Sequence, residues 1–207
     1  MQQYADAASA YAYVNQSPVA SSISYYMEAK SKQQIEGANF PEIIALIDTA
    51  ILKSVGNETP AYLLENAELK MQFGLYEQAI KDFDRYYLLA AGKVNDAFYY
   101  YREQAKFRNN DLMGALSDIE EALYMDKSNA IYHAEKASIL LRMQDPAGAQ
   151  LAAEKAIVLD PEFASTYRLL GLCLVRQDKK TEACQQFEKA KELGDQIVER
   201  LINEHCK

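Results

Sequence analysis

The sequence is poor in several kinds of residue, and each shortage excludes a class of protein. Of 207 residues only two are histidine and three are cysteine, and tryptophan is absent. Three cysteines are too few for the disulfide framework of a small secreted domain. No apolar run approaches the ~20 residues that a membrane-spanning helix needs, so we expect no membrane insertion.

Positive charge is also scarce. Lysine and arginine number 22 against 30 aspartates and glutamates, a formal net charge of -8. Because a nucleic-acid-binding protein neutralises phosphates with surplus basic residues, we expect no nucleic-acid partner. Eight glycines and five prolines, with 49 % hydrophobic and 25 % charged residues, are typical of a mostly helical soluble protein.

Little in the sequence indicates catalysis. The two histidines are His133, at a core-type position, and His205, near the C-terminus. We interpret His133 as a packed, hydrogen-bonded residue. No Ser/His/Asp set, phosphate loop or metal-spaced Cys/His cluster is found, and His205 with Cys206 supplies only two ligands. We therefore predict no enzyme, no cofactor and no metal site.

The cysteines leave the compartment open. Cys173 and Cys184 lie on two neighbouring predicted helices and could approach each other, but we interpret the cysteines mainly as small buried hydrophobic residues. No signal peptide is visible. A cytoplasmic protein and a periplasmic or secreted protein whose signal peptide has been removed both remain possible.

The clearest pattern runs from Ala164 to Asp195. Apolar residues at helical spacing follow Ala164, a polar turn comes next, and a second helix carries Ala183, Phe187 and Ala190 on one stripe at i, i+4 and i+7. Small residues at Gly171 and Ala183 allow two antiparallel helices to approach closely. Such a hairpin buries only one side, so its other apolar faces need neighbours.

Similar hairpin patterns, which could supply those neighbours, recur along the chain at a nearly constant interval. Two backward steps of 34 residues from Ala183, then three of 36, reach apolar residues that each begin an equivalent stripe: Ala149, Ala115, Ala79, Ile43 and Ala7. A repeat of this length is typical of an array of helical hairpins.

These hairpins resemble the tetratricopeptide repeat. The residues that carry the resemblance most clearly are Tyr167, Leu170, Gly171, Ala183, Phe187 and Ala190. The family's tryptophan is missing, and its position is taken by Met27, Leu63, Tyr99, His133 and Tyr167. The resemblance implies an all-α, right-handed superhelical solenoid that binds peptides or proteins and is not usually a catalyst.

The spacing also predicts the domain organisation. Residues 18–194 form an array of five hairpins, at about 24–59, 60–95, 96–129, 130–163 and 164–194, and residues 195–207 form a C-terminal capping helix. Residues 1–17 are either an N-terminal cap helix or a leading half-repeat of a natural chain that continues upstream. We expect Asp96 to cap its helix, and Asp145-Pro146 to start another.

The family resemblance also implies which positions of the first helix of each repeat line a concave groove. For this chain we predict a peptide-binding groove with these residues: Tyr100, Tyr101, Gln104, Phe107, Arg108, Arg142, Arg168, Leu172 and Arg176.

Arg108, Arg142 and Arg176, here called the arginine row, occupy the same position in three successive repeats. One hypothesis is that the row holds an acidic or C-terminal segment of a partner. The alternative is structural, because arginine in the last turn of a helix is favoured by the helix dipole at ~0.3–1 kcal/mol without any ligand.

One subset of the family does not fit. Its carboxylate clamp grips the C-terminal tails of heat-shock chaperones through Lys, Asn and Arg side chains. The corresponding positions here hold Leu64, Glu68, Tyr101, Ile131 and Glu135. We therefore predict a scaffold for another protein or peptide; the alternative is a structural module that self-associates into a homo-oligomer through its terminal hairpins.

Overall fold

The computed structural model describes residues 2–54 and 59–206, and all regular secondary structure in these ranges is α-helical. The helices, in chain order, are α1 (Gln2–Val14), α2 (Ser22–Gln33), α3 (Phe40–Lys53), α4 (Thr59–Gln72), α5 (Tyr76–Leu89), α6 (Asp96–Arg108), α7 (Leu112–Met125), α8 (Ala130–Arg142), α9 (Pro146–Leu159), α10 (Ala164–Arg176), α11 (Lys180–Glu192) and α12 (Val198–His205). The expected all-α class is confirmed.

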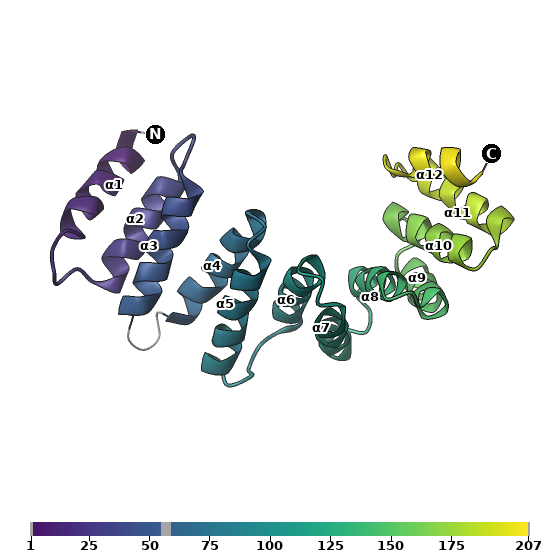
Figure 1. The fold of residues 1–207 in the computed structure, drawn as a ribbon, viewed down its shortest axis with the longest axis horizontal. Coiled ribbons are helices and arrows are strands. Elements are labelled where there is room, and N and C mark those ends of the chain that lie inside the picture. Colours follow the sequence, from purple (N-terminus) through teal and green to yellow (C-terminus); the bar gives the residue numbers. More distant parts are fainter. Residues whose placement is uncertain (1, 55–58, 207) are drawn as a thin grey trace. The chain divides into compact units, whose positions relative to one another are not determined.

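The chain forms two compact units, Met1–Val94 and Asn95–Lys207. In each unit, helices that follow one another in sequence pack side by side, α1 to α5 in the first and α6 to α12 in the second (Figure 1). Within each unit, the described helices are antiparallel hairpins stacked in chain order. The grouping into five repeats with two terminal helices stays a prediction.

Short polar side chains define where several helices begin. Asp145 accepts a hydrogen bond from the Gly148 amide, and Pro146 is the first residue of α9, as predicted. The predicted cap at Asp96 is wrong. Asn95 caps α6 by accepting from the Phe98 amide at 3.0 Å, and Asp96 is the first helical residue. The asparagine side chain reaches the free amide because it lies just outside the helix.

A column of small residues allows the two helices of a hairpin to approach. Ala67, Ala137 and Gly171 are buried at equivalent positions of α4, α8 and α10. A Cβ atom at Gly171 would lie 2.3 Å from a ring carbon of Phe187 on α11. The predicted close approach at Gly171 is therefore confirmed, and a larger residue there would push α10 away from α11.

Each unit has its own apolar core. In the first unit, Ile43 and Ile47 of α3 and Leu63 of α4 are fully buried in one cluster. In the second unit, Phe187 and Ala190 of α11 are buried in a cluster that also contains Val198 of α12.

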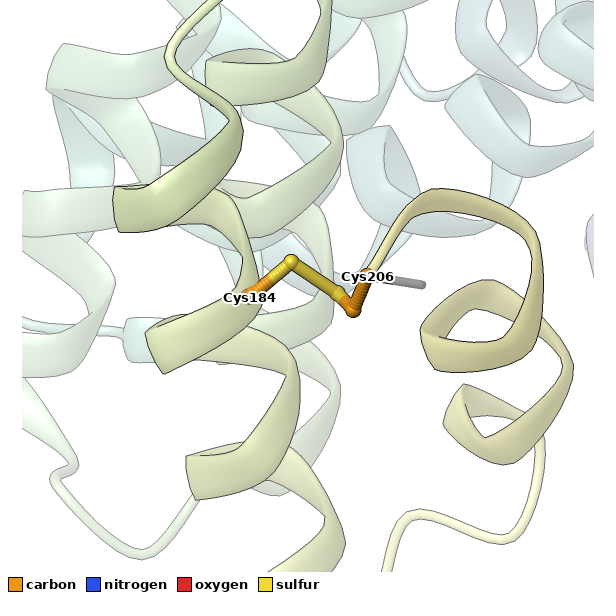
Figure 2. The surroundings of a disulfide bond; sticks show 2 residues. All are labelled: Cys184 and Cys206. Carbon is orange, nitrogen blue, oxygen red and sulfur yellow. A yellow bond between two sulfur atoms is a disulfide. The ribbon is translucent and has the colours of Figure 1, made fainter.

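The interpretation of the cysteines is wrong for two of the three. Cys184 on α11 forms a disulfide with Cys206, just beyond α12, and not with Cys173 (Figure 2). Cys173 is fully buried in α10, as expected of a small hydrophobic residue. Sequence spacing could not reveal the pairing, because it depends on how α12 turns back onto α11.

No helix in the described part of the chain is both long and apolar enough to cross a membrane.

Candidate peptide-binding surface

The predicted groove residues lie on α6, α8 and α10 of the second unit. At the α6 end they form an aromatic group. The Tyr100 ring lies 5.6 Å from the Tyr101 ring and 5.4 Å from the Tyr132 ring of α8, measured between centroids. Tyr101 is 44 % exposed, whereas Tyr132 is buried. The exposed ring of Tyr101 therefore stands beside aromatic neighbours that limit its movement.

A hydrogen bond between α6 and α8 holds this group in place. The Tyr132 hydroxyl donates to Asp96 at 2.7 Å. Burial and this bond to a carboxylate raise the pKa of Tyr132. Tyr100 is half-buried, and its pKa is raised by burial and then by the nearby carboxylates Glu135 and Glu103. Both hydroxyls therefore stay protonated at neutral pH, and the proton of the Tyr132 hydroxyl is already donated to Asp96.

Arg142, at the end of α8, is fixed by the preceding hairpin. Its guanidinium donates to the backbone carbonyl of Phe107 at 3.2 Å and to the Asn110 side chain at 3.1 Å. The same group lies 4.8 Å from the centroid of the Phe107 ring. These contacts bring Phe107 and Arg142 together and hold the guanidinium in one orientation.

Arg142 and Arg176 line one hollow at the ends of α8 and α10. It has a volume of about 340 Å³, and its other lining residues are Leu141, Gln144 and Pro146. Both arginines are exposed. Two guanidinium groups and an amide around one hollow make a site that favours an anionic group.

Arg108 and Gln104 lie on α6 and do not line the hollow formed by Arg142 and Arg176. Arg108 is exposed and Gln104 is half-buried. Burial raises the pKa of Glu135 on α8, and the positive charge of Arg108 opposes that rise. Arg108 is therefore close enough to a carboxylate of this protein to interact with it, so it differs from Arg142 in its surroundings.

Two of the predicted groove residues, Arg168 and Leu172, make contacts within the second unit that stabilise the fold. Arg168 forms an ion pair with Asp195 through Nε at 2.7 Å, and that carboxylate is only 6 % exposed. Leu172 is half-buried and packs against the core around Phe187. Neither side chain joins the hollow formed by Arg142 and Arg176. The sequence could not reveal the pairing of Arg168, because Asp195 lies 27 residues away beyond the next helix.

Sequence reasoning missed Glu103 of α6. Its side chain is fully buried, and neither carboxyl oxygen has a hydrogen-bond partner among the described residues. A signal for it exists: Glu103 stands 34 residues before Ala137 and 68 before Gly171, in the column of small residues. A carboxyl group in that column is an exception to the packing rule of the hairpin.

The described residues that could take part in catalysis or metal binding include His133. The His133 ring is half-buried, and its Nε2 lies 3.1 Å from the backbone oxygen of Lys127. Within residues 2–54 and 59–206, no cluster of three or more His, Cys, Asp and Glu side chains could hold a metal ion.

Antiparallel hairpins stacked in sequence order, with small residues at their contact, are the architecture of a helical-repeat protein. Among solved structures, MamA (41-end) from Desulfovibrio magneticus RS-1 matches with a TM-score of 0.72 at 19 % identity, covering 83 % of this chain and 94 % of that one. The structure of YrrB, described as a TPR protein with an unusual peptide-binding site, matches with a TM-score of 0.70 at 15 % identity, covering 96 % and 100 %.

One relative is similar in sequence as well. The small glutamine-rich tetratricopeptide repeat-containing protein 2 of Saccharomyces cerevisiae is 30 % identical over 98 residues, which are 47 % of this chain and 28 % of that protein. No protein-family model matches the chain. The chain therefore has the fold of tetratricopeptide-repeat proteins, and the resemblance drawn from its sequence is confirmed.

Proposed function

We propose that the chain is a non-catalytic scaffold that binds an extended acidic or C-terminal segment of a partner protein along α6, α8 and α10. The observation that carries the proposal is the hollow shared by Arg142 and Arg176. Arg142 is held there by Phe107 and Asn110, so less side-chain freedom is lost when an anion binds.

The neighbouring aromatic residues supply the second part of the surface. Tyr101 is exposed, and Tyr100 packs between it and Tyr132. Tyrosine offers a large contact area with few rotatable bonds and a hydroxyl for hydrogen bonding. An extended segment advances ~3.3 Å per residue, so its side chains can meet the aromatic group and the hollow in turn.

The peptide-binding site stated for YrrB supports this use of the fold, at the level of architecture. The lining of this chain's surface determines what it binds. Charge-assisted hydrogen bonds to a carboxylate are worth ~1.5–3 kcal/mol each when shielded from water.

Arg176→Ala tests the proposal most cleanly, because Arg142 also holds the preceding turn. The probe is a fluorescent hexapeptide with acidic residues and a free C-terminal carboxylate, and the measurement is fluorescence anisotropy with the full chain. We expect Kd to rise about tenfold or more, and affinity to fall with added salt.

The exposed Arg200→Ala on α12 is the matched control and should leave Kd unchanged. A C-terminally amidated hexapeptide separates recognition of the terminal carboxylate from recognition of acidic side chains. Equal affinity of the Arg176→Ala and unaltered proteins would overturn the proposal. Light scattering at the same concentrations shows whether binding occurs to single chains or to a homo-oligomer.

A further inference from the structure

The end of the second unit is covered by a very short helix. α12 has eight residues, and Val198 at its start is fully buried. Leu201 and Ile202 pack against the core that contains Phe187 and Ala190 of α11. α12 therefore occupies the apolar end of the unit, where a further hairpin would otherwise stack.

Noncovalent contacts fix the start of this segment more firmly than its end. The buried carboxylate of Asp195, just before α12, pairs with Arg168 at 2.7 Å. The ion pair between Lys191 and Glu199 has both side chains about half exposed, so it contributes little. At the far end the His205 ring lies 6.2 Å from the Phe187 ring, measured between centroids. An isolated helix of eight residues is not stable in water, so α12 depends on what holds its far end.

The disulfide holds that far end. Cys206 is the C-cap residue that follows α12, and its bond to Cys184, 22 positions earlier, ties it back onto α11, with the two Cα atoms 5.7 Å apart (Figure 2). A crosslink of this kind removes much of the conformational freedom that the opened segment would gain.

The disulfide is accessible. Both of its cysteines are only partly buried, and both line an open hollow of about 670 Å³ along α11 whose other walls include Lys180, Gln185 and Glu188. Cys173 is the contrast within the chain: it is fully buried, and burial raises its pKa to about 11. A reductant can therefore approach the Cys184–Cys206 bond, whereas Cys173 is shielded and poorly reactive.

We propose that the Cys184–Cys206 bond is a redox-sensitive tether that controls whether α12 covers the end of the second unit. A dithiol reductant transfers two electrons and two protons. The Sγ–Sγ bond breaks, both cysteines become thiols, and the dithiol becomes a disulfide. In the reduced protein α12 opens and uncovers the apolar surface around Phe187 and Ala190. This inference is independent of peptide binding.

Trypsin cleavage of the full chain after Arg200 measures the opening, because Arg200 lies inside α12 and is cut only when the helix unfolds. Mass spectrometry of quenched, reduced samples follows the released C-terminal fragment. We expect reduction with a phosphine to raise the cleavage rate on the order of 100-fold. Cleavage after Lys155, within α9, should not change and shows that the rest of the unit stays folded.

Two variants complete the test. Cys206→Ser should be cleaved at the fast rate with or without reductant, and Cys173→Ala should respond to reduction like the unaltered protein. The proposal is overturned if oxidised and reduced proteins are cleaved at equal rates. It is also overturned if the response to reductant persists in Cys206→Ser, or if Cys184 and Cys206 are alkylated in the aerobically purified protein before reduction.

Discussion

Glu103 shows how one side chain can make a helical repeat sensitive to pH. Burial, followed by the nearby carboxylates of Glu135 on α8 and Asp118 on α7, raises the pKa of this carboxyl to about 8. The neighbouring cations Arg102 and Lys106 form ion pairs with Asp118, at 2.7 and 2.8 Å, and neither donates a hydrogen bond to Glu103. Glu103 is therefore mostly protonated at neutral pH.

Glu103→Gln is predicted to make the protein more stable at pH 8 and to leave it nearly unchanged at pH 5. The folded-state pKa lies above the usual value of 4.5. Between these values the unfolded chain releases the proton and the folded chain keeps it, so the free energy of unfolding falls as pH rises from about 4.5 to about 8. Glutamine cannot ionise. We expect a gain on the order of a few kcal/mol at pH 8, measured by urea unfolding at both pH values.

The exposed Glu121→Gln on α7 is the control, because it removes one negative charge without touching a buried carboxyl. If Glu103→Gln and the unaltered protein differ by the same free energy at pH 5 and pH 8, Glu103 does not titrate as described.

At the scale of the element, a buried ion pair joins the two helices of a hairpin twice in succession. Lys70 of α4 binds Asp82 of α5 at 2.7 Å, and 36 residues later Lys106 of α6 binds Asp118 of α7 at 2.8 Å. Lys70 also binds Asp48 of α3 at 2.9 Å. These lysines stand on the first helix of each hairpin, and the first of them links three helices.

Lys70→Ala is predicted to destabilise the protein by about 3 kcal/mol. The Lys70 side chain is 5 % exposed and that of Asp82 is 15 % exposed. Removing the lysine leaves the Asp82 carboxylate largely buried without its cation, and an unpaired buried charge is strongly destabilising. Burial already raises the pKa of Asp82 despite Lys70. The measurement is the free energy of unfolding in urea.

The matched control is Lys81→Ala, because Lys81 pairs with Glu77 at 2.7 Å on the surface of α5, with both side chains about 70 % exposed. Exposed pairs of this kind contribute little to stability. Similar losses for Lys70→Ala and Lys81→Ala would contradict the account.

At the scale of the whole molecule, stability is distributed over neighbouring helices. The core of the first unit gathers around α3 and α4, and that of the second includes α9 to α12. In a stack of hairpins each element contacts its sequence neighbours, so stability is close to a sum of local terms.

We therefore expect Lys70→Ala to act locally. Hydrogen exchange followed by mass spectrometry should become faster in α3, α4 and α5 and stay unchanged in α10 and α11. Reduction of the disulfide should make hydrogen exchange faster in α12 and leave it unchanged in α3 to α5. A uniform increase over all helices in either experiment would show that the chain opens as one cooperative unit.

The sequence by itself determined the all-α class of the fold. Periodic apolar residues make amphipathic helices, and recurring small residues such as Ala149, Ala183 and Gly171 allow those helices to pack closely, so local pattern is sufficient. Tertiary structure alone decided which side chains meet across helices. It paired Cys184 with Cys206 and Arg168 with Asp195, and it placed Arg142 beside Arg176. It also left the Glu103 carboxyl without a hydrogen-bond partner in the described part of the chain. These contacts depend on the rotation and path of each helix, which sequence spacing does not specify.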